Sequence, residues 1–122
     1  MIKIEHITAD IRDTLNTIPE VSGRVFPLVA MTKEGVNYPF IVFERTSTTF
    51  DGTKDGFADV SVTFNVRIVT ATYFEGVALL DKAIEKLQRP HSDHEITYHP
   101  RLLGTSEDFS ENAYIQTVTF SV

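Results

Sequence analysis

Two segments contain residue types and spacings that could do chemistry. The first reads FDGTKDGF at residues 50–57 and places two aspartates beside two glycines and a lysine. The second reads HSDHEITYH at residues 91–99 and contains His91, Asp93, His94, Glu95 and His99. Carboxylates in a glycine-containing turn raise the possibility of a calcium loop or a phosphate cradle. Three histidines within nine residues raise the possibility of a transition-metal site.

The first segment does not fit a calcium loop. Such a loop of the EF-hand type needs oxygen ligands at positions one, three, five and twelve, and a glycine at position six. Counted from Asp51, positions five and six are Asp55 and Gly56, but position three is Thr53 and position twelve is Val62. A phosphate-binding loop would lead into a helix, whereas a strand pattern follows here. We therefore interpret the segment as the tip of a β-hairpin.

The histidine segment is interpreted as a solvated loop. If residues 94–99 form a strand, His94 and His99 point to opposite faces. His91 follows Pro90 directly, in a segment where helical spacing has no meaning. A metal-dependent enzyme using His91, His94 and His99 remains an alternative, but we predict no metal site.

The remaining charged residues carry no catalytic motif. Asp51 with Asp55, and Glu107 with Asp108, lie in turn-like segments, where a carboxylate stays solvated and its pKa is not tuned for catalysis. Arg45 and Arg67 are expected to project from strands, opposite the apolar faces, as exposed partners of acids on neighbouring strands. No nucleophile elbow, dinucleotide fingerprint or zinc-protease motif occurs. We predict no catalytic residue and no cofactor.

Composition limits the class of protein. The 122 residues are sufficient for a single domain, residues 1–122, and 42% of them are hydrophobic. There is no cysteine, and the net charge is -6, which disfavours nucleic-acid binding. No apolar run approaches the roughly 20 residues needed to span a bilayer, and no signal-peptide pattern opens the chain. A cytoplasmic protein is expected.

The elements that must position these residues can be predicted from periodicity. An amphipathic helix carries Ile4, Ile7, Ile11, Leu15 and Ile18 and ends before Pro19. A short extended piece at 23–27 precedes two strands at 38–49 and 59–70, with their turn inside 50–58. Val60, Val62, Phe64, Val66 and Ile68 alternate with polar residues and should face the helices. A weak strand at 94–99 and a stronger one at 112–122 complete the set.

A second helix is predicted between the strand at 59–70 and Pro90. Thr72 and Glu75 have the spacing of a capping box, and Gly76 suggests a close approach of another backbone. The expected buried stripe is Phe74, Val77, Leu80, Ile84 and Leu87. The order helix, strands, helix, strands predicts an α+β fold: a mainly antiparallel β-sheet with two amphipathic helices packed on one face.

A family resemblance adds to this. GRVFP at 23–27 and the stretch YPFIVFERTSTTFDGTKDGFADVSVTFNVRIVTATYFEGVALLDKAIEKL resemble small phage and prophage proteins grouped as tail-completion, terminator-like or head-to-tail joining proteins. The similarity lies in the strand opening at Pro39–Val42, the hairpin tip TKDG at Thr53–Gly56, the alternating strand, and the helix entry at Thr72 and Tyr73. It covers roughly residues 20–88.

The resemblance implies a structural, non-enzymatic α+β subunit without a cofactor. Such subunits form a ring, often a hexamer, between the tail tube and the head connector of the virion, after assembly in the host cytoplasm. On this basis we expect the hairpin tip to contact a neighbouring subunit or the head connector through Asp51, Gly52, Thr53, Lys54, Asp55, Gly56 and Phe57. A small cytoplasmic interaction domain unrelated to phage remains an alternative. Membranes and sequence-specific nucleic acid are not expected partners.

Overall fold

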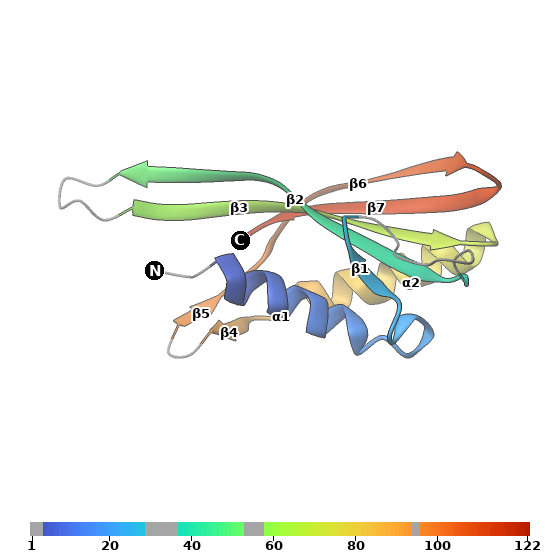
Figure 1. Cartoon of the computed structure of the whole chain (residues 1–122), viewed down its shortest axis with the longest axis horizontal. Helices are drawn as coiled ribbons and strands as arrows, with labels where there is room; N and C mark the ends of the chain where they lie inside the picture. The colour runs from blue at the N-terminus through green and yellow to red at the C-terminus, as the bar shows by residue number, and fades with distance from the viewer. Residues whose placement is uncertain (1–3, 29–36, 53–57, 94–95) are drawn as a thin grey trace.

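A computed structural model describes residues 4–28, 37–52, 58–93 and 96–122 of the chain. Two helices lie on one face of a β-sheet, with the architecture shown in Figure 1. The α+β prediction is therefore confirmed. The elements in chain order are α1 (Ile4–Asn16), the 3-10 helix η1 (Pro19–Val21), β1 (Val25–Pro27), β2 (Phe40–Gly52), β3 (Ala58–Thr70), α2 (Tyr73–Leu87), β4 (His91–Asp93), β5 (Ile96–Tyr98), β6 (Arg101–Ser110) and β7 (Ala113–Ser121).

The main sheet has the strand order β1-β2-β3-β7-β6. Its pairs are antiparallel except that β1 runs parallel to β2, with Val25 opposite Ile41. β2 and β3 pair from Phe40 with Val69 to Gly52 with Ala58, which confirms the predicted antiparallel pairing; the residues that join them, 53–57, lie outside the description. β4 and β5 form a separate two-stranded sheet.

Two long hairpins point in opposite directions along the sheet (Figure 1). One is β2–β3; the other is β6–β7, which closes through Glu111 and Asn112, both with positive φ. Successive positive φ angles are typical of a tight hairpin turn. Residues 101–110 were not predicted to be a strand, and Glu107 with Asp108 was wrongly assigned to a turn. In β6 only Leu102 is half-buried, so the alternation that reveals a half-buried strand is absent.

The core lies between the helices and the sheet. α1 buries Ile7, Ile11 and Leu15, and its last turn gives way to the 3-10 helix that begins at Pro19. The sheet contributes Val62, Phe64, Val66 and Ile68, all fully buried as the alternation predicted; the side chain of Val60 lies outside the described part. The rings of Phe64 and Phe120 stack with centroids 5.6 Å apart.

The buried face of α2 differs from the predicted stripe. Gly76, Leu79, Ala83 and Leu87 are buried, whereas Phe74 is 81% exposed and Val77, Leu80 and Ile84 are only partly buried. Of the predicted stripe only Leu87 is fully buried. Both sets have helical spacing, and the chosen face is the one whose small residues, glycine and alanine, let the helix lie close to the sheet.

Gly76 marks this close contact. A Cβ atom at this position would lie 2.8 Å from Thr70 Oγ1 and 3.3 Å from Gln116 Cγ. The approaching groups are therefore side chains of β3 and β7, not the backbone that was expected. Thr72 is the N-cap of α2 but makes no side-chain capping bond; its hydroxyl instead lies 3.4 Å from Glu75 Oε2, so the predicted capping box does not form. Neither helix of the described part has the length and apolar character needed to cross a membrane.

Candidate functional site

The β2–β3 hairpin forms an arm whose outer part belongs to no other strand pair in the described chain. β1 pairs with β2 only between Ile41 and Phe43, and β7 follows β3 only as far as Val62. Beyond these points the two strands pair with each other alone. The expected contact residues Asp51 and Gly52 end β2, so Asp51 lies in a strand and not in a turn. Thr53, Lys54, Asp55, Gly56 and Phe57 lie outside the described residues.

A β-bulge lies at the base of the arm. Arg45 is opposite Phe64 and Ser47 is opposite Thr63, so Thr46 is an extra residue in β2. Because residues directly opposite each other in an antiparallel pair share a face, Arg45 lies on the helix side of the sheet with Phe64. The expectation that Arg45 projects from the opposite face is therefore wrong. The bulge changes which β2 side chains face the helices.

The helix side of the arm has a groove, here called the arm groove. It has a volume of about 420 Å³ and is lined by Ile4, Arg45, Thr46, Ser47, Thr48 and Phe50. Ile4 is the first residue of α1, so the groove begins where the helix layer ends. Phe50 is 64% exposed, and Arg45 is exposed as well. A large apolar ring and a cation thus lie together on an open surface.

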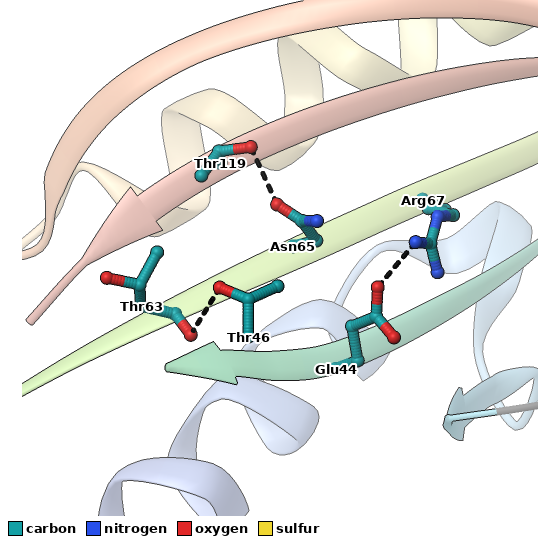
Figure 2. A network of polar contacts seen from close by, with 6 residues as sticks. All are labelled: Glu44, Thr46, Thr63, Asn65, Arg67 and Thr119. Carbon is teal, nitrogen blue, oxygen red and sulfur yellow. Dashed lines mark hydrogen bonds and ion pairs between the residues drawn. The ribbon is translucent and has the colours of Figure 1, made fainter. Parts of the chain in front are cut away.

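Figure 2 shows polar contacts between neighbouring strands near the base of the arm. Arg67 forms an ion pair with Glu44, as predicted for this arginine. Thr119 of β7 donates a hydrogen bond of 2.7 Å to the Asn65 side chain of β3, and the Thr46 hydroxyl donates one of 3.3 Å to the carbonyl of Thr63. These contacts link β2, β3 and β7 where the arm leaves the sheet.

A second concave surface lies at the other end of the sheet, where α2 begins beside the β6–β7 hairpin (Figure 1). We call it the aromatic–carboxylate pocket. It has a volume of about 270 Å³ and is lined by Tyr73, Glu107, Asp108, Phe109, Tyr114 and Gln116. The ring of Tyr114 lies 5.9 Å from that of Tyr73 and 4.8 Å from that of Phe109, measured between centroids. Phe109 remains 55% exposed despite this packing.

Glu107 organises the polar side of this pocket. Its Oε2 accepts a hydrogen bond of 2.9 Å from the Tyr73 hydroxyl and one of 3.1 Å from Gln116 Nε2. The hydrogen bond to Glu107 and its negative charge raise the pKa of Tyr73 above its ordinary value of 10.0. A raised pKa keeps the phenol neutral and makes it a hydrogen-bond donor, whereas an activated tyrosine nucleophile or base needs a lowered pKa. The arrangement is therefore suited to binding.

The histidine segment is not brought together as a ligand set in the described chain. His91 Nδ1 lies 2.9 Å from Asp10 Oδ2, and the His91 side chain is only 9% exposed. It thus joins β4 to α1, and the prediction of a solvated loop histidine is wrong for His91. His99 is exposed, whereas His94, Glu95 and the side chain of Asp93 lie outside the description. Among the described residues no group of three potential metal ligands occurs.

Sequence comparison adds no family to this description. The chain matches no protein-family model and no curated protein sequence. The candidate binding surfaces are the arm groove and the aromatic–carboxylate pocket. Of these surfaces, the aromatic–carboxylate pocket was missed from the sequence because β6 was missed. The available signal was Tyr73 and Phe109, two aromatic residues that belong to no predicted apolar stripe.

Proposed function

We propose that the chain is a structural subunit of a phage tail, of the tail-completion or head-to-tail joining kind, and that its copies associate into a ring. The observation that carries the proposal is the β2–β3 arm. Its outer strands keep unpaired backbone edges among the described residues, and its helix side exposes Phe50. Unpaired edges and exposed aromatic residues on a projecting hairpin favour contact with another protein chain.

The family resemblance supports the identity of that other chain. It spans the arm and implies subunits arranged in a ring around the end of a tail tube. A ring requires a heterologous interface, in which one surface of each subunit contacts a different surface of the next. The arm is one such surface, since it projects past the helix layer at one end of the molecule (Figure 1).

The test is deletion of the gene from an inducible prophage, followed by electron microscopy of the lysate. We expect filled heads to accumulate separately from free or overlong tails, and the wild-type gene supplied in trans to restore complete particles. Normal, infectious particles after deletion would exclude the proposal and favour an interaction domain outside the virion.

Complementation with variants then tests the role of the arm. Phe50→Asp should fail to restore particles because it places a charge on the helix side of the arm. Thr49→Asp is the matched control: Thr49 is exposed one residue away, and alternation places it on the opposite side of β2. It should complement. Equal complementation by both variants would show that the helix side of the arm makes no required contact.

A further inference from the structure

The arm groove and the aromatic–carboxylate pocket are complementary in charge and lie at opposite ends of the same face of the sheet. Arg45 is opposite Phe64, which is a core residue on the helix side. Glu107 is opposite Gln116 and Phe109 is opposite Tyr114, on the same side as Val118 and Phe120. α1 begins beside the groove and α2 begins at the pocket. The molecule therefore has two different surfaces that could meet head to tail.

Resting on the proposed ring, we infer that Arg45 of one copy enters the aromatic–carboxylate pocket of the next copy and pairs there with Glu107. The occupant of the pocket is thus a second copy of this chain. Phe50, on the same side of the arm as Arg45, would add apolar contact with the exposed ring of Phe109 or Phe74.

The pocket has an acceptor available for this cation. Both hydrogen bonds to Glu107 end on Oε2, and no described residue donates to Oε1. The rings of Tyr73, Phe109 and Tyr114 line the same pocket as Glu107. A guanidinium group is planar, donates along two parallel directions to a carboxylate and stacks on aromatic rings. The pocket therefore has the chemistry that recognises arginine.

Arg45 is the best placed cation of the described chain. Arg12, Arg67, Lys82 and Arg89 each form an ion pair with a carboxylate. Arg24 is half-buried and donates to the carbonyl of Glu20. Arg101 is opposite Ser121 on the other face of the sheet, and Lys86 is half-buried on α2. Arg45 alone among the described cations combines exposure, the helix side of the sheet and a position at the end opposite the pocket.

Cysteine cross-linking tests this contact because the chain contains no cysteine of its own. A chain carrying both Arg45→Cys and Glu107→Cys should, with a short bismaleimide linker that spans the length of the two replaced side chains, give a ladder of covalent oligomers. A mixture of the two single variants should stop at dimers, since each chain then has one linking position. Arg101→Cys combined with Glu107→Cys is the matched control at an exposed arginine on the other face, and it should give no ladder.

The cross-linking is done with the concentrated protein and in lysates of the induced prophage, so that assembly on the tail tube is included. Absence of the ladder in both would overturn the inference. If deletion of the gene still blocks tail joining in that case, the proposed function stands and the ring uses another interface. A ladder together with normal particles after deletion would give the reverse result: the contact exists but the phage role does not.

Exchanging the charges of Arg45 and Glu107 shows whether the pocket binds a second copy of this chain or a different protein. Arg45→Glu and Glu107→Arg should each weaken self-association roughly tenfold or more, as expected when like charges meet at a contact. The double variant should recover it, because the pair is restored in reverse. If a basic segment of another protein fills the pocket, the double variant will not recover association, and the inference is wrong. Thermal melting of each variant checks that the fold is kept, since Glu107 also accepts hydrogen bonds from Tyr73 and Gln116.

Discussion

The hydroxyl of Tyr73, the first residue of α2, donates a hydrogen bond of 2.9 Å to Glu107 of the edge strand β6. Among the described strands, β6 pairs with β7 alone. This bond and the ring contact between Tyr73 and Tyr114 therefore tie the β6–β7 hairpin to the start of the helix. The same bond shapes the polar side of the aromatic–carboxylate pocket.

Tyr73 should titrate above its ordinary pKa of 10.0, because the phenolate would lose its hydrogen bond to Glu107 and face its negative charge. A raised pKa means that this contribution to stability is complete below pH 10.0 and is lost as the pH rises through the folded-state pKa. Glu107→Gln should lower the pKa of Tyr73. The measurement is ultraviolet absorbance of tyrosinate, with Tyr73→Phe to isolate this residue. An unchanged titration in Glu107→Gln would contradict the assignment.

Gly76→Ala should destabilise the fold although alanine favours helices. The new Cβ would lie 2.8 Å from Thr70 Oγ1, and that hydroxyl is fixed by a bond of 2.7 Å to the carbonyl of Thr72. We expect a loss of about 1–3 kcal/mol in the free energy of unfolding by chemical denaturation. Gly104→Ala is the control, since its Cβ would meet no atom within 4 Å. Adding Thr70→Ala to Gly76→Ala should recover part of the loss, and strict additivity would argue against the clash.

Leu79→Ala and Phe74→Ala should differ sharply in their effect on the free energy of unfolding. Leu79 is 2% exposed and belongs to the core, so its truncation should lower stability by about 2–5 kcal/mol. Phe74 is 81% exposed, and its truncation should change stability by no more than about 0.5 kcal/mol. If the two variants lose comparable stability, Phe74 lies in the core and the buried stripe predicted from the sequence is correct.

The ion pair between Glu20 and Lys82 should make the stability of the fold depend on pH in the acidic range. The hydrogen bond from Lys82 lowers the pKa of Glu20 below its ordinary value of 4.5. The unfolded chain therefore takes up this proton near pH 4.5, and the folded chain does so only at lower pH. The stabilisation is complete above that value and is lost as the pH falls through the folded-state pKa. The difference in melting temperature between the wild type and Glu20→Gln should shrink over this interval, and a constant difference would contradict the prediction.

Glu111→Gly should stabilise the β6–β7 hairpin. Glu111 has a φ of 52°, a left-handed conformation that side chains other than asparagine and aspartate adopt at a cost of about 1–2 kcal/mol. Glycine removes this cost but adds freedom to the unfolded chain, so a net gain of about 0.5–1 kcal/mol is expected in the free energy of unfolding. Asn112 has a φ of 63°, and Asn112→Gly, which replaces a residue already suited to this conformation, should give a smaller gain.

The sequence predicts an element well where one of its faces is buried. β3 alternates without interruption, and α1 carries a single apolar stripe, so both were recognised from period alone. β6 is exposed on both faces, and its turn, Glu111-Asn112, lacks the glycine that marks a tight hairpin. Neither periodicity nor turn chemistry was therefore available to reveal it.

The candidate surfaces were harder to predict than the elements. The bulge at Thr46 reverses the alternation of β2, so the face occupied by Phe50 depends on one unpaired residue that no sequence pattern identifies. The contact between Tyr73 and Glu107 joins residues 34 positions apart and depends on β6 lying beside β7. Arg67 could be predicted because its neighbours alternate regularly on both sides.

The strand order β1-β2-β3-β7-β6 also has a consequence for the order of events during synthesis. β7, which is made after the other described strands, lies between β3 and β6. Until it is complete, β3 keeps an open edge beside Phe64 and Val66, and Phe120 is missing from the stack it forms with Phe64. The nascent chain can form the local β2–β3 hairpin early, but it must wait for a distant strand to close the core. During that interval its apolar sheet face is open to association with other unfinished chains.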